Sequence, residues 1–249
     1  MTIIFSLFVF RNIAQNIDST QKAPSYFGTA ISVTNNGISL LPSFTLGKPA
    51  LIVELVLGKG RLSFEPQLRF ALEGKPWSFV FWGRYKLIKS QKFFMNVGTH
   101  PAVAFRTIKI TNNGITQEMQ VAQRYLAAEF MPTFVTGKHS NIGLYYLTSH
   151  GFEQDAIQYT HFVSLRSSFN QLSLYKDWHL SVAPQLYYLK MDATDAVAFS
   201  SSFTLAKDHY PLSLSSVINK TIQTTIPGMK DFIWNVSLVY SFHKQYTAH

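Results

Sequence analysis

The feature that most constrains the fold is a strict alternation of apolar and polar residues along most of the chain. Residues 61–73 show it without interruption. Their apolar face carries Leu62, Phe64, Pro66, Leu68, Phe70 and Leu72. Because successive side chains of a β-strand point to opposite faces, a period of two predicts a strand and excludes a helix over the same residues.

The same period recurs in residues 178–188, 197–205 and 231–242, and short segments rich in Gly, Asn, Asp, Lys and Pro separate the alternating stretches. Such segments are typical of hairpin turns. We therefore predict an all-β chain of about twelve antiparallel strands, joined by short loops at both ends. The expected strands are residues 38–46, 50–57, 61–73, 77–88, 93–108, 119–134, 141–149, 157–168, 175–191, 196–206, 212–226 and 232–242.

Residues 26–33 also alternate and are a further strand candidate. A bacterial single-chain barrel has an even number of strands, and twelve already satisfies this rule. We therefore interpret residues 26–33 as an N-terminal extension, and fourteen strands is the alternative.

The composition favours a membrane environment for these strands. Only 14% of the residues are charged, against about 25% in a soluble domain. Aromatic residues make up 15%, and several lie near expected strand ends on the apolar face, among them Trp77, Phe79, Tyr85 and Trp178. That arrangement is typical of the aromatic girdles of membrane barrels. The prediction is an up-and-down antiparallel transmembrane β-barrel.

The last expected strand carries a resemblance. Residues 232–242 end at Phe242, preceded at alternate positions by Trp234, Val236, Leu238 and Tyr240. This segment resembles the C-terminal strand of Gram-negative outer-membrane β-barrel proteins, which closes with an aromatic residue. The resemblance implies an outer-membrane location, contact with outer-membrane lipid and recognition by the barrel-assembly machinery during insertion. In that family the aromatic residue is usually the last one, whereas here a tail of residues 243–249 follows.

The N-terminal region has the composition of an export signal. Residues 3–10 are an apolar run of signal-peptide length, but Arg11 follows the run instead of preceding it. We interpret residues 1–14 as an imperfect signal peptide, with a buried first strand as the alternative. Residues 15–25 are polar and predict a linker, so that the barrel covers residues 26–242.

Charged side chains on the spanning strands should face the lumen, because exposure to lipid is costly. Cations outnumber carboxylates five to three among these positions, which favours either a mildly anion-preferring pore or an ion-pair network that plugs the barrel. The expected lumen-lining residues are Glu54, Glu65, Arg69, Trp82, Arg84, Lys86, His100, Arg106, Glu129, Arg166 and Tyr187.

The expected function is a passive small-solute channel or a structural membrane barrel. An accessory barrel subunit of a larger outer-membrane complex is the alternative, and a lipid-acting barrel enzyme is the third hypothesis. Outer-membrane phospholipases carry a His-x-Ser spacing, whereas His161 and Ser164 are three residues apart and should face opposite sides of a strand. We therefore expect no catalytic residues.

No cofactor, metal or nucleic-acid partner is expected. The chain has no cysteine, which excludes thiolate metal sites, and it has no glycine-rich phosphate loop. His150, Glu153 and Asp155 are the one metal-site candidate, and nothing else in the pattern supports it. The net charge of +9 is spread along the chain without a basic cluster, which argues against nucleic-acid binding.

Overall fold

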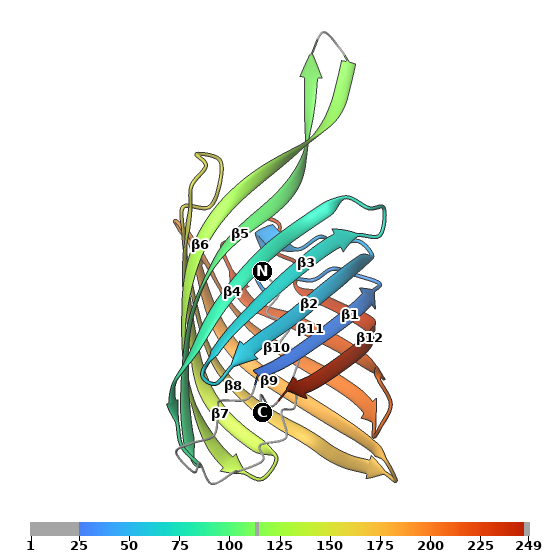
Figure 1. Ribbon diagram of the computed structural model, residues 1–249. Helices are drawn as coiled ribbons and strands as arrows, with labels where there is room; N and C mark the ends of the chain where they lie inside the picture. The colour runs from blue at the N-terminus through green and yellow to red at the C-terminus, as the bar shows by residue number, and fades with distance from the viewer. Residues whose placement is uncertain (1–24, 113–114, 247–249) are drawn as a thin grey trace.

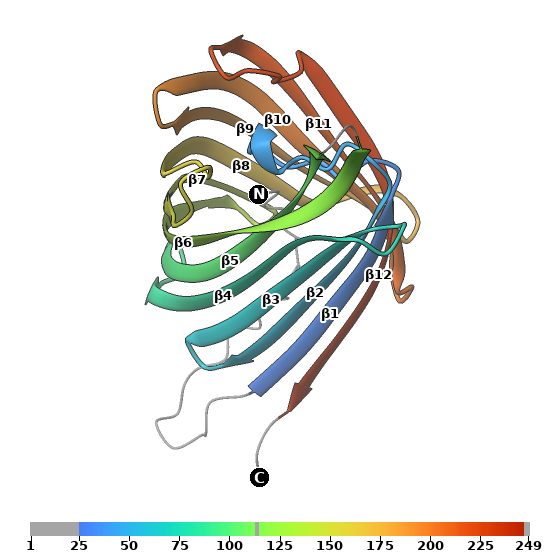
Figure 2. The ribbon, with the colours of Figure 1, turned by 90° about the horizontal axis from the view of Figure 1, so that it is seen from above.

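The computed structural model describes residues 25–112 and 115–246 and is a closed barrel in which every strand pairs antiparallel with two neighbours. The twelve strands follow chain order around the barrel, and β12 closes it by pairing with β1 (Figures 1 and 2). The predicted all-β, twelve-stranded, up-and-down barrel is confirmed. The expected signal peptide, residues 1–14, and nearly all of the expected linker, residues 15–25, lie outside the described residues.

The strands are long, as tilted spanning strands must be. They are β1 (Ser25–Thr34), β2 (Ala50–Lys59), β3 (Leu62–Ala71), β4 (Pro76–Lys89), β5 (Phe93–Asn112), β6 (Ile115–Gly137), β7 (Ser140–Gly151), β8 (Tyr159–Tyr175), β9 (Trp178–Met191), β10 (Thr194–Lys207), β11 (Leu212–Thr224) and β12 (Phe232–Tyr246). One 3-10 helix, η1 (Pro42–Phe44), lies between β1 and β2. No helix in the described ranges is long and apolar enough to cross a membrane.

The strand count was right, but one member was wrong. Residues 26–33, expected to be an extension, belong to β1, which pairs with β2 on one side and β12 on the other. Residues 38–46, expected to be the first strand, contain η1 and fold into the barrel mouth, where Leu40 and Leu41 are only 4% exposed. Apolar residues that cover a barrel end give the same local pattern as a short strand, so the pattern alone did not separate the two.

The expected tail is also partly strand. β12 continues to Tyr246, and Gly28 to Ser25 of β1 pair with His243 to Tyr246. Phe242 points outward and its ring lies 6.3 Å from that of Phe27 on β1. Because of this pairing with β1, the last strand extends four residues beyond Phe242.

The outer face of the barrel is apolar and the inner face is mixed. Large apolar side chains on the outer face are commonly 40–60% exposed, for example Leu165, Leu186 and Leu238. The aromatic residues Phe70, Phe79 and Phe105 form a continuous run on β3, β4 and β5, with ring centroids 5.4 and 5.2 Å apart. An exposed apolar band that ends in an aromatic run is the outer surface of a membrane barrel.

Trp77 is not part of that outer face, contrary to the sequence expectation. The register between β3 and β4 shifts next to it, because Arg69 pairs with Ser78 while Phe70 pairs with Pro76. This β-bulge turns the Trp77 side chain inward, where it is 4% exposed. A bulge changes which face a residue occupies, and the alternation of the sequence does not reveal it.

Five prolines fall within the strands expected from the sequence, and four of them lie in strands of the structure. At each of these four, the pairing with one of the two neighbouring strands is interrupted. Pro66 lies where the β2–β3 pairing skips from Glu54↔Gln67 to Leu57↔Phe64. Proline has no N–H to donate, so such gaps are its direct consequence. The other gaps are at Pro101 between β4 and β5, Pro132 between β6 and β7, and Pro184 between β8 and β9. The fifth, Pro42, begins η1 instead.

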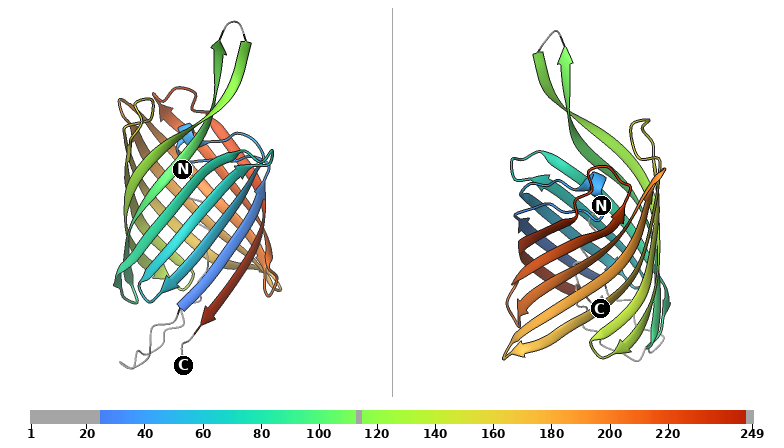
Figure 3. Two further views of the ribbon diagram at one scale, coloured as in Figure 1. Left: turned by 45° about the horizontal axis from the view of Figure 1, so that its top comes forward. Right: turned by 180° about the vertical axis from the view of Figure 1, so that it is seen from behind.

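The two ends of the barrel differ. At the end that carries Ser25 and Tyr246, called here the terminal end, the connections are the tight turns 60–61, 90–92, 138–139, 176–177 and 208–211. The far end carries residues 35–49, 152–158 and 225–231 and a long hairpin of β5 and β6. Residues 105–112 and 115–122 of this hairpin, called here the ribbon, pair only with each other in the described structure and rise above the rim (Figure 3). The expectation of short loops at both ends was therefore wrong.

Candidate functional site

An ionic cluster lines the inner wall over strands β3 to β7. The Arg84 guanidinium of β4 forms an ion pair with Glu65 of β3 and another with Glu129 of β6, where Nε lies 2.6 Å from Oε1. The Tyr145 hydroxyl of β7 donates to the second oxygen of Glu129 at 2.8 Å. The Glu129 side chain is 0% exposed and that of Arg84 is 13% exposed. Two carboxylates therefore compensate the buried cation, as burial of a charge requires.

Aromatic rings flank this cluster. The Arg84 guanidinium lies 4.1 Å from the Trp82 ring centroid, and Trp82 packs edge-on against His100 at 4.0 Å. Arg166 of β8 lies 4.6 Å from the ring of Tyr145. Six of the expected lumen-lining residues, Glu65, Trp82, Arg84, His100, Glu129 and Arg166, are thus one connected group on the inner wall.

The other expected residues are placed separately. Arg69 donates to Gln67 at 2.7 Å and lies 5.4 Å from the Trp77 ring. Lys86 lies 5.5 Å from the Tyr26 ring, nearer the terminal end. Tyr187 on β9 exchanges hydrogen bonds with Asn219 of β11. Glu54 is 6% exposed on the inner face of β2.

Arg106 differs from the rest. It pairs with Val121 within the ribbon, beyond Ala104, the last residue of β5 to pair with β4. It therefore lies at the base of the ribbon and not along the spanning part of the wall.

Residues 35–49 form a cover over the far mouth of the barrel, called here the mouth segment. The Trp77 indole N–H donates to the carbonyl of Phe44 at 2.8 Å, and the Phe44 ring packs edge-on against Tyr125 at 5.0 Å. Leu40 and Leu41 belong to the same buried cluster as Trp82, Tyr125 and Tyr187. Figure 2, viewed from this end, shows η1 inside the ring of strands.

Sequence reasoning missed several residues of this interior. Tyr125, Tyr145 and Phe162 are inner-face aromatic residues at most 4% exposed, and the alternation phase that identified Trp82 and Tyr187 would have found them. The inward position of Trp77 carried no such signal, because it follows from a bulge.

The enzymatic and metal candidates have other partners. The His161 ring lies on the outer face 2.9 Å from the Tyr146 hydroxyl, while Ser164 is buried on the inner face. His150 contacts the carbonyl of Gln158, and Glu153 binds Arg124. Within the residues that the structure describes, no three His, Asp or Glu side chains gather as metal ligands would.

Comparisons with solved structures give the fold its context. No family model matches the sequence, and the search of curated proteins found no match. A KdgM porin, solved in complex with disordered oligogalacturonate, superposes with a TM-score of 0.50 at 7% identity over 87% of this chain and 99% of the porin. An outer-membrane channel from Pseudomonas putida F1 superposes with a TM-score of 0.51 at 10% identity, over 92% of this chain and 100% of the channel. This chain is an outer-membrane β-barrel.

LpxR from Salmonella typhimurium also matches, with a TM-score of 0.48 at 12% identity over 86% of this chain and 99% of LpxR. At such identities the likeness concerns the fold alone. Outer-membrane barrels have short periplasmic turns and longer extracellular loops. The terminal end of this barrel is therefore periplasmic, and the mouth segment and the ribbon are extracellular.

Proposed function

We propose that this outer-membrane β-barrel conducts small solutes passively and prefers anions. The observation that carries the proposal is the charge of the inner wall. Four of the expected cations, Arg69, Arg84, Lys86 and Arg166, lie along the spanning part of this wall, against the three carboxylates Glu54, Glu65 and Glu129. In a narrow tube with low-dielectric walls, such an excess of cations concentrates anions and repels cations.

Two further features support a channel. The two barrels reported above with TM-scores of at least 0.50 are named as a porin and a channel. The mouth segment narrows the extracellular entrance while Trp77 and Tyr125 hold it in place. A segment folded into the mouth limits the size of the solutes that can enter the lumen.

Ion conductance in planar lipid bilayers tests the proposal. We expect channels whose reversal potential in a salt gradient reports an anion-to-cation permeability ratio above one. Lys86→Gln should lower this ratio, and Lys190→Gln, which removes an exposed cation from the outer face of β9, should leave it unchanged. A folded wild-type barrel that never conducts would support the structural alternative, in which Trp82, Tyr145 and Tyr187 fill the lumen.

The ribbon favours a second candidate, an accessory subunit of a larger outer-membrane assembly. Its inward face carries Ile108, Ile110 and Met119, which are 37–46% exposed although they lie outside the spanning region. Exposed apolar residues at such a place are typical of protein contacts. Light scattering of the purified barrel, with and without Ile110→Ser and Met119→Ser, tests whether this face joins copies of the chain.

A further inference from the structure

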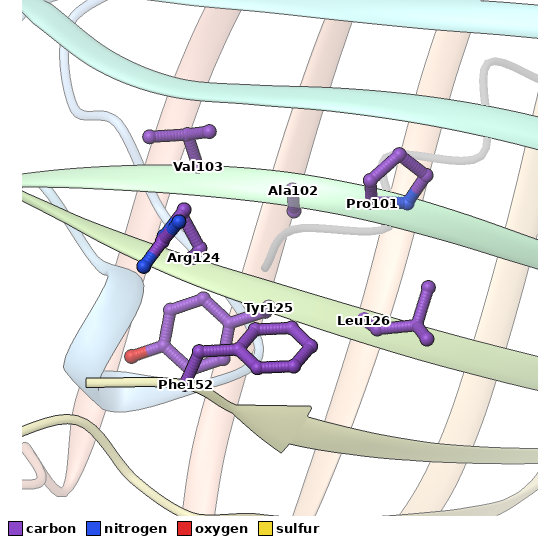
Figure 4. Close-up of a pocket in the computed structure, with 7 residues that line it drawn as sticks. All are labelled: Pro101, Ala102, Val103, Arg124, Tyr125, Leu126 and Phe152. Carbon is purple, nitrogen blue, oxygen red and sulfur yellow. The ribbon is translucent and has the colours of Figure 1, made fainter. Parts of the chain in front are cut away.

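The outer wall of the barrel carries a groove at its extracellular edge. The groove has a volume of about 400 Å³ and crosses β5 and β6 beside Phe152, the first residue of the loop of residues 152–158 (Figure 4). Its wall is apolar and is formed mainly by Pro101, Val103, Leu126 and Phe152. Leu126 and Phe152 are 49% and 55% exposed, so the groove is open to the surroundings of the barrel.

The position of the groove places it against lipid. Pro101, Val103 and Leu126 are in the outward phase of β5 and β6, and their inward neighbours Ala102 and Tyr125 are buried. Phe105, two residues beyond Val103, ends the outer aromatic run with Phe70 and Phe79. Because aromatic runs mark the level of lipid head groups, the groove begins at the head groups and extends toward the acyl chains.

A cation stands at the head-group end of the groove. The Arg124 side chain is 70% exposed, and its Nε donates to Glu153 Oε1 at 2.6 Å. The backbone N–H of Arg124 donates to the other carboxylate oxygen at 2.6 Å. Glu153 therefore fixes one edge of the guanidinium and leaves the edge with the two terminal nitrogens exposed beside the groove. That edge matches the geometry of a phosphate group.

We propose that the groove binds a phosphate-bearing lipid of the outer leaflet, with one acyl chain between Leu126 and Phe152 and the phosphate on the terminal nitrogens of Arg124. This proposal concerns the outer wall and does not depend on conduction through the lumen.

The physical argument assigns different roles to the two parts of the site. An acyl chain in the bilayer is already away from water, so an apolar groove alone distinguishes poorly between lipids. Arg124 supplies the selectivity, because a guanidinium held at the edge of a low-dielectric region binds phosphate through charge-assisted hydrogen bonds. A free phosphate lacks the chain and meets an arginine that Glu153 partly neutralises, so it binds weakly.

Native mass spectrometry of the full barrel in detergent tests the proposal. The probes are dioleoylphosphatidic acid, dioleoylglycerol with no phosphate, dihexanoylphosphatidic acid with short chains, and inorganic phosphate. We expect the barrel to retain dioleoylphosphatidic acid about tenfold more than dioleoylglycerol. Arg124→Gln should abolish that preference, and Lys190→Gln, which removes another exposed outer-face cation, should preserve it.

Phe152→Ala tests the contribution of the acyl chain separately from that of the head group. It should lower retention of the dioleoyl phosphatidic acid but not of the dihexanoyl form, and heat-modifiable gel migration checks that each variant is folded. Equal retention of phosphate-bearing and phosphate-free lipid by the wild type overturns the proposal. So does a preference that survives Arg124→Gln in a folded barrel, or binding of inorganic phosphate as tight as that of the dioleoyl lipid.

Discussion

Arg84 and Glu129 form an ion pair across a strand that separates them. They lie on β4 and β6, and both face Gly98 of the intervening β5, to which each is the paired residue. A Cβ atom at Gly98 would lie 2.8 Å from Glu129 Oε1 and 3.0 Å from Arg84 Cγ. The missing side chain is what lets the two charges meet over the strand.

Gly98→Ala should therefore destabilise the barrel. The added methyl group overlaps a carboxylate that Arg84 and Tyr145 hold in place, which costs about 1–3 kcal/mol. Urea unfolding of the barrel in lipid vesicles measures the change. Gly83→Ala is the matched control on β4, because its Cβ would meet nothing closer than 3.8 Å and should cost little. Equal losses in the two variants would contradict the assignment.

Removal of the Trp77 side chain should release the mouth segment. Trp77→Ala deletes the hydrogen bond to Phe44 and the contacts with Ala50, Ile52 and Leu46, at a cost of about 3–5 kcal/mol. If the barrel conducts, its single-channel conductance should rise in planar bilayers. Trp234→Ala, which truncates an outward tryptophan that is 51% exposed, should leave conductance unchanged. A conducting Trp77→Ala variant with wild-type conductance would remove the segment from any constricting role.

Two adjacent residues of β10 test which face meets lipid. Phe203 points outward, and Ser202 points inward between Ala183 and Val217 of the paired strands. Phe203→Arg places a cation in hydrocarbon, which costs about 2–4 kcal/mol near the bilayer midplane. Ser202→Arg places it in the interior beside small neighbours and should cost less. The reverse order of unfolding free energies would mean that the faces are inverted.

The outer part of the ribbon should be dispensable for the barrel. Residues 107–112 and 115–120 pair only with each other in the described structure, and their links to the wall are an exposed ion pair between Lys75 and Glu118 and a hydrogen bond from Gln120 to Pro76. Exposed ion pairs contribute about 0–1 kcal/mol. Replacing residues 107–120 with Asn-Gly should preserve heat-modifiable migration and the urea midpoint. A variant that fails to fold would show that the ribbon participates in assembly.

Acid should loosen the loop of residues 152–158. The hydrogen bond from the Arg124 side chain lowers the pKa of the Glu153 carboxyl below its ordinary value. Since the pKa is lower in the folded state, the interaction stabilises the barrel fully above about pH 5 and is lost as the pH falls through the lowered pKa. The difference in unfolding free energy between the wild type and Glu153→Gln should therefore shrink on acidification. A difference that grows at low pH would have the wrong sign.

The sequence determined the architecture through repetition. Each alternating segment is weak evidence for a strand by itself, but the segments and the turns between them recur over most of the chain and all indicate the same barrel. Within each strand the alternation also indicates the face of a residue, as for Arg69 and Leu68 on opposite faces of β3. The same phase placed Arg84, Glu129 and Tyr187 on the inner side, because side chains of a strand alternate without exception unless a bulge intervenes.

Only the tertiary structure decided how those parts meet. Three features depend on residues far away in the chain. They are the pairing of β12 with β1, the inward direction of Trp77, and the folding of residues 38–46 into the mouth segment instead of a strand. The same holds for the ion pair over Gly98 and the groove between β5, β6 and the 152–158 loop. Alternation reports which side of a strand a residue occupies, whereas strand register and closure fix its neighbours, and those are set by pairing across the whole barrel.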